Sequence, residues 1–225
     1  MRIEIAGENS LIIYFADRAS AEVSAYVQQA TSILQDVFAK DIIDMVPSYA
    51  SLLVIYDALS TDSFTVKTKI NQNLANLAVD IAATGKVVTL PVYYSPESGA
   101  DLESLAKKAN LTVAEVIEIH QQCHYRVYAI GFAPGFAYLG EVDPRIATPR
   151  LASPRLNVPR GAVAIADQQT AVYPASSPGG WNLIGLCPQR MFDPQAEPCM
   201  PVQVGDKVRF KAISRADFLS LGGEL

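Results

Sequence analysis

Residues 143–161 read Asp-Pro-Arg-Ile-Ala-Thr-Pro-Arg-Leu-Ala-Ser-Pro-Arg-Leu-Asn-Val-Pro-Arg-Gly, so a Pro-Arg pair recurs every five residues. Proline has a fixed φ and no N–H, and it therefore excludes a helix here and the middle of a sheet. We expect the stretch, called the Pro-Arg strip below, to run extended along a sheet edge or as a loop. This places irregular, edge-type backbone at the centre of the second half of the chain.

The strip carries four arginines and no acidic residue between Asp143 and Asp167, although the chain has a net charge of −5. Arginine presents its N–H groups in a planar fork that fits carboxylates and phosphates. Two interpretations follow: a site for a small anion, or a surface loop that arginine keeps soluble.

The composition is that of a folded soluble protein, since half of the 225 residues are hydrophobic and 18% are charged. The acidic balance argues against nucleic-acid binding. No signal peptide and no apolar run of membrane-spanning length is expected. Three cysteines without a Cys-x-x-Cys pair indicate reduced thiols and a cytoplasmic location.

Residues 1–83 predict a small α/β domain of the order ββαββα with an antiparallel sheet. Alternating apolar residues predict strands at 3–5, 11–15, 42–46 and 52–56. Apolar residues at helical spacing predict helices at 20–38 and 63–82.

Residues 84–225 predict an all-β barrel or sandwich with two flanking helices. Residues 87–94 predict an edge or irregular strand because they include Pro91. Helices are expected at 101–110 and at 112–122, the second opened by a capping box between Thr112 and Glu115. Short strands between turn residues are expected at 126–130, 162–166, 171–173, 183–185 and 207–210.

Two glycine-rich loops are candidate site elements. Residues 131–140 combine glycine with aromatic side chains and indicate either a close approach of backbone to a ligand or a tight barrel corner. Residues 177–181, Ser-Pro-Gly-Gly-Trp, indicate either backbone N–H groups that face an anion or a plain turn with a packed indole.

His120 and His124 are the only histidines, and with Cys123 they form His-x-x-Cys-His. No third ligand is evident, so we expect no metal site. His120 lies on the apolar face of its helix, which suits either a core-edge histidine with satisfied nitrogens or a general acid/base. The chain has neither a P-loop nor a Gly-x-Ser-x-Gly elbow, and no self-sufficient catalytic machinery stands out.

The two loops and the strip together resemble a known family. It comprises the B subunit of 5-oxoprolinase, allophanate hydrolase subunit 1, the matching part of the urea carboxylase carboxyltransferase domain, and an inhibitor of the sporulation histidine kinase. The resemblance rests on residues 131–140, Thr148-Pro149-Arg150, Pro154-Arg155, Gln169-Thr170, Tyr173-Pro174, 177–181 and 183–185. The chain departs from the usual pattern at Ala137, Arg160, Ala162 and Ala171.

The resemblance implies a cyclophilin-like β-barrel for the second half. It also implies two partners from 5-oxoprolinase, the barrel-shaped C subunit and the A subunit, with which 5-oxoproline is cleaved to glutamate using ATP as co-substrate. The chain alone is expected to be inactive. The rival functions are a subunit of an allophanate- or urea-type enzyme, and a non-enzymatic inhibitor that binds a histidine kinase.

We assign Arg150 and Arg155 as anion clamps, Gln169 as an orienting amide and His120 as the acid/base candidate. The expected substrate-binding residues come from the two glycine loops and from Tyr173. They are Phe132, Pro134, Gly135, Phe136, Tyr138, Tyr173, Pro178, Gly179, Gly180 and Trp181.

Overall fold

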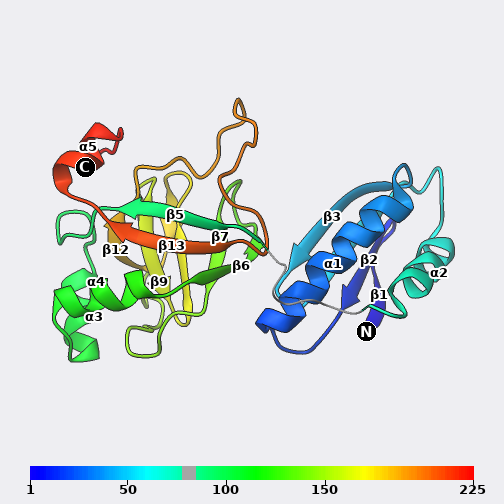
Figure 1. Cartoon of the computed structure of the whole chain (residues 1–225), viewed down its shortest axis with the longest axis horizontal. Coiled ribbons are helices and arrows are strands. Elements are labelled where there is room, and N and C mark those ends of the chain that lie inside the picture. Colours follow the sequence, from blue (N-terminus) through cyan, green and yellow to red (C-terminus); the bar gives the residue numbers. More distant parts are fainter. Residues whose placement is uncertain (78–84) are drawn as a thin grey trace. The chain divides into compact units, whose positions relative to one another are not determined.

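The computed structural model describes residues 1–77 and 85–225, and the chain divides into two compact units, Met1–Thr84 and Gly85–Leu225 (Figure 1). The expected domain boundary at residue 83 and residues 78–82 of the helix expected at 63–82 lie outside the described residues, and within them that helix already ends at Leu74.

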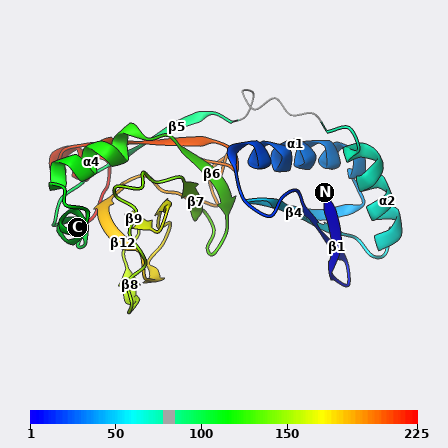
Figure 2. The same cartoon turned by 90° about the horizontal axis from the view of Figure 1, so that it is seen from below.

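The first unit is a four-stranded antiparallel sheet with two helices packed on it. Its elements are β1 (Arg2–Gly7), β2 (Ser10–Tyr14), α1 (Ala21–Phe38), β3 (Ile42–Ser48), β4 (Ser51–Tyr56) and α2 (Ser63–Leu74), and the strand order is β1-β2-β4-β3. The side chain of Ser20 caps α1 by accepting from the N–H of Val23 at 3.1 Å. The helix then lays its apolar stripe along one face of the sheet (Figure 2).

The second unit holds the remaining strands and three helices. Its elements are β5 (Val87–Val92), α3 (Leu102–Ala109), α4 (Val113–Gln122), β6 (Tyr125–Ile130), β7 (Ala137–Gly140), β8 (Arg155–Val158), β9 (Ala162–Ala166), β10 (Gln169–Val172), β11 (Ser177–Gly179), β12 (Asn182–Leu186), β13 (Lys207–Ala212) and α5 (Arg215–Ser220).

Seven strands of the second unit form a nearly closed barrel in the order β12-β9-β10-β7-β6-β13-β5. The edge strand β5 carries Pro91, as expected for an edge. Just past its end, Tyr93 exchanges two backbone hydrogen bonds with Leu186 of β12, at 2.8 and 3.0 Å. These bonds bring the two outer strands of the sheet together. The predicted fold class, ββαββα followed by an all-β barrel, is confirmed.

The Pro-Arg strip contains no helix, as predicted. Its one regular segment, β8, pairs only with β11 in a separate two-stranded sheet. The strands β7, β8 and β11 and the helix α5 were not predicted. The three strands have four residues or fewer and lie among glycine and proline, so their pairing depends on partners distant in the chain.

Helix α4 packs against β13, and α3 packs against β12 and α4. Helix α4 begins with the predicted capping box, in which Thr112 and Glu115 exchange side-chain and backbone hydrogen bonds. Within residues 1–77 and 85–225, no helix combines the length and the apolar composition that crossing a bilayer requires.

Candidate functional site

A pocket of about 120 Å³ lies in the second unit where the two glycine loops meet the strip. All nine residues that line it are among those assigned from the sequence: Phe132, Phe136, Tyr138, Arg150, Tyr173, Pro178, Gly179, Gly180 and Trp181. The ring of Phe136 meets those of Tyr173 and Trp181 edge-on, with centroids 5.3 and 5.7 Å apart. The pocket thus has a buried aromatic wall.

The backbone around Gly135 positions Phe136. Gly135 has a φ of +81°, and a Cβ built on it would lie 2.6 Å from the carbonyl oxygen of Met191. Only glycine allows both this conformation and this contact. The loop can therefore fold back so that the next residue turns its ring into the aromatic wall.

Gly179 and Gly180 differ in the space around them, and this gives a matched pair of variants. A Cβ on Gly179 would overlap the hydroxyl of Tyr173, whereas on Gly180 it would lie 3.6 Å or more from its nearest neighbours. Gly179→Ala should displace Tyr173 and lower the free energy of unfolding by about 1–3 kcal/mol, as overpacking does. Gly180→Ala should leave it nearly unchanged. Thermal melts of both variants test this, and equal losses would contradict the packing described.

The arginines of the strip have different surroundings. Arg145 donates to both carboxylate oxygens of Asp143, at 3.0 and 2.8 Å, and holds the pKa of that carboxyl at about 2. Arg160 lines a different cavity. Only Arg150 reaches the aromatic pocket, where its guanidinium carbon lies 5.7 Å from the centroid of a Trp181 ring.

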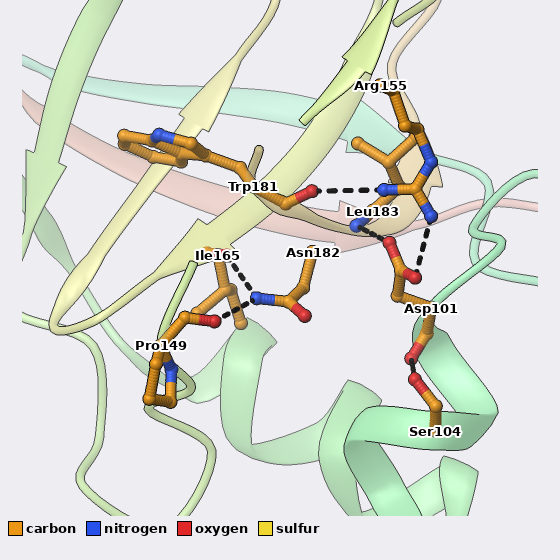
Figure 3. Close-up of polar contacts among 8 residues, drawn as sticks. All are labelled: Asp101, Ser104, Pro149, Arg155, Ile165, Trp181, Asn182 and Leu183. Carbon is orange, nitrogen blue, oxygen red and sulfur yellow. Dashed lines mark hydrogen bonds and ion pairs between the residues drawn. The ribbon is translucent and has the colours of Figure 1, made fainter. Parts of the chain in front are cut away.

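Two hydrogen bonds hold the backbone on either side of Arg150. The amide of Asn182 donates to the carbonyl of Pro149 at 2.9 Å (Figure 3). The N–H of Leu151 donates to the carbonyl of Gly180 at 2.7 Å. Among the described residues, no hydrogen bond or ion pair engages the Arg150 guanidinium. The pocket therefore presents one cation with its N–H donors available to a ligand.

Tyr173 offers a neutral hydroxyl at the same pocket. Burial raises the pKa of its phenol, and the nearby charge of Arg150 opposes that shift. The protonated phenol can donate one hydrogen bond to an acceptor on a bound molecule.

Arg155 does not line the pocket. It forms an ion pair of 2.7 Å with Asp101, whose side chain is 11% exposed, and it also donates to the carbonyl of Trp181 at 3.4 Å. Its donors thus face the protein. Gln169 begins β10, where it pairs with Gly140 and Ala166. Gln169, Pro134 and Gly135 also fall outside the pocket lining.

His120, the acid/base candidate assigned from the sequence, does not line the aromatic pocket. The side chain is fully buried, with Nδ1 2.7 Å from the hydroxyl of Tyr94 and Nε2 3.1 Å from that of Thr170. Its ring stacks on Phe210 at 4.6 Å. The reason is that His120 shares the face of α4 that packs against β13, and burial lowers its pKa to about 3.

A larger cavity of about 680 Å³ opens elsewhere in the second unit. Its charged lining balances Arg160 and Arg190 against Asp193 and Glu224, and most of the lining is exposed. Neither feature selects a ligand. In the part of the chain that the structure describes, no group of three or more His, Cys, Asp or Glu side chains could hold a metal ion.

Asp101 and Asn182 hold the site together but were not predicted from the sequence. Asp101 begins a predicted helix, where an acidic residue is common, so nothing marked its contact with a strand far along the chain. Asn182 directly follows the Ser-Pro-Gly-Gly-Trp loop, and this adjacency was the available signal.

Comparison with known proteins agrees with this architecture. Residues 1–202 match the family model described as carboxyltransferase domain, subdomain C and D. The B subunit of 5-oxoprolinase from Bacillus subtilis (strain 168) is 39% identical over 227 residues, which cover 96% of this chain and 95% of that protein.

Two solved structures share the fold. TTHA0988, known from a crystal structure, is 34% identical in sequence to this chain and superposes with a TM-score of 0.80. The match covers 92% of this chain and 40% of TTHA0988, so the present chain spans well under half of the length of that protein. The urea amidolyase of K. lactis gives a TM-score of 0.76 at 15% identity, over 97% of this chain and 15% of that one. At that identity the likeness concerns the fold alone.

Proposed function

The chain belongs to the carboxyltransferase-domain family of subdomains C and D, and from this premise we propose that it is the B subunit of an ATP-dependent 5-oxoprolinase. The observation that carries the proposal is the 39% identity, over nearly the full length of both chains, to a protein named as the B subunit of that enzyme. The proposed reaction is cleavage of 5-oxoproline to glutamate, with ATP as co-substrate.

The chemistry of the aromatic pocket supports a small anionic ligand with an apolar ring. Its volume of about 120 Å³ lies below the ~300–1,000 Å³ of sites for drug-sized molecules. The one guanidinium, that of Arg150, matches a single carboxylate. The aromatic wall suits the ring carbons, and the Tyr173 hydroxyl can donate to the lactam oxygen. In this assignment Arg150 orients the substrate and Tyr173 polarises the amide.

The pocket does not provide a complete reaction. Neither a nucleophile with an adjacent base nor a phosphate-binding loop occurs among its lining residues. We therefore propose that the two partner proteins, the A and C subunits, supply the remaining groups and the ATP site, and that this chain alone is inactive.

Co-expression tests the proposal directly. The chain should co-purify with the C subunit, and the complex completed with the A subunit should release phosphate only when 5-oxoproline is present. The chain purified alone should release none. Robust turnover by the isolated chain, in a preparation free of its partners, would contradict the division of roles.

The same assay separates the rival functions. Phosphate release that depends on allophanate, or carboxylation of urea, in place of a response to 5-oxoproline would assign a sister activity. Inhibition of a histidine kinase by the chain alone, without formation of a complex with the C subunit, would favour a non-enzymatic role.

A further inference from the structure

Arg155 is held by an aspartate that lies far from it in the sequence. Nη2 of Arg155 donates to Oδ1 of Asp101 at 2.7 Å, and the two residues are 54 positions apart in the chain. The aspartate is 8% exposed overall. A carboxylate this well buried needs a charged partner and further hydrogen bonds, because desolvation of an unpaired charge is costly.

Asp101 also forms hydrogen bonds with β12 near the start of that strand, at Leu183. Its Oδ2 accepts from the N–H of Leu183 at 2.7 Å, and its own backbone N–H donates to the carbonyl of Leu183 at 2.9 Å. Arg155 donates to the carbonyl of Trp181, which lies two residues before Leu183. Figure 3 shows Arg155 and Asp101 next to each other beside the segment from Trp181 to Leu183, and the hydroxyl of Ser104 in α3 donates to the backbone carbonyl of Asp101 at 3.0 Å.

The segment held in this way carries one wall of the aromatic pocket. Trp181 is 5% exposed, and its indole packs edge-on against Phe136 and lies under the guanidinium of Arg150. A shift of its backbone would move the aromatic wall and the cation above it together. The guanidinium of Arg155 donates to the carboxylate of Asp101 and to the carbonyl of Trp181, so these N–H groups point into the protein.

We propose that Asp101 and Arg155 are positioning residues, which fix Trp181 in the pocket through their ion pair and do not themselves bind the ligand. The role of this pocket in catalysis rests on the proposed function, whereas the geometric effect of the pair on Trp181 does not.

Trp181 is the only tryptophan of the chain, so its fluorescence reports on this place alone. Asp101→Asn keeps the shape of the side chain and removes its charge. We expect a red-shifted emission maximum and stronger quenching by acrylamide, with an unchanged far-UV circular dichroism spectrum. Asp143→Asn, which breaks the exposed ion pair with Arg145 in the same strip, is the matched control and should leave emission and quenching as in the wild type.

Arg155→Lys keeps the charge but not the planar fork, so it should give an intermediate emission shift. It is also the variant to measure if Asp101→Asn does not fold. In the assembled complex, Asp101→Asn should lower turnover by about a hundredfold, as expected when a group in a site is misplaced by about 1 Å.

Emission and quenching identical to the wild type in a folded Asp101→Asn or Arg155→Lys protein would overturn the inference. A changed emission in a chain whose complex never hydrolyses 5-oxoproline would instead refute the proposed function and leave the positioning pair standing. Normal turnover by a complex whose Trp181 emission has shifted would show that the position of the indole does not matter for the reaction, and would overturn the catalytic part of the inference.

Discussion

Arg150→Ala is expected to lower kcat/KM of the assembled complex for 5-oxoproline by about ten- to a hundredfold, because a hydrogen bond to a charged group contributes roughly 1.5–3 kcal/mol. Arg150 is the one guanidinium that lines the aromatic pocket, and no carboxylate among the described residues neutralises it. Steady-state kinetics of 5-oxoproline-dependent phosphate release measure the effect.

Arg145→Ala is the control for this variant. It removes an arginine of the same strip that is already paired with Asp143 at the surface, and exposed pairs contribute little to stability. Its kinetics and its melting temperature should stay near those of the wild type. The folded state of Arg150→Ala should persist as well, since the side chain is exposed. Equal small losses of kcat/KM in Arg150→Ala and Arg145→Ala would contradict a ligand-binding role of Arg150. The arginines of the strip would then serve solubility only.

The fold was predictable where local pattern decides it. The helical spacing in residues 20–38 and the capping box at Thr112 depend only on neighbours in the chain, and both occur as expected. The strand β7 could not be predicted, because Ala137–Gly140 is a strand only through its pairing with β6 and β10. Pairing between distant segments leaves little trace in the local sequence.

The site was predictable in part for a similar reason. Glycine and aromatic residues clustered in two short motifs, together with Arg150 and Tyr173, identified every residue that lines the pocket. The partner of Arg155 was not predictable, since Asp101 lies 54 positions away in the chain, whereas Arg145 pairs with the nearby Asp143 within the strip. These partners, and not the spacing of the Pro-Arg pairs, leave Arg150 available and turn Arg155 inward.

Replacing His120 should have the largest effect on stability. His120→Ala leaves a cavity beside Phe210 and removes one hydrogen-bond partner each from Tyr94 and Thr170, so we expect a loss of about 3–5 kcal/mol in the free energy of unfolding. His124→Ala, at the exposed end of the same segment, should change it little. Denaturant titration followed by Trp181 fluorescence reports on the second unit alone.

The dependence of stability on pH tests the same residue without altering its neighbours. Burial lowers the pKa of His120 from 6.5 in the unfolded chain to about 3 in the folded protein, so below pH 6.5 the unfolded chain binds the extra proton. The contribution of neutral His120 to the free energy of unfolding is therefore fully present above pH 6.5. It decreases as the pH falls from 6.5 to about 3, by at most about 1.4 kcal/mol per pH unit. A His120→Asn variant should lack this part of the slope. If instead that variant kept the wild-type stability at every pH but turned over 5-oxoproline far more slowly, His120 would be an acid/base residue and its burial in the core would not describe the working complex.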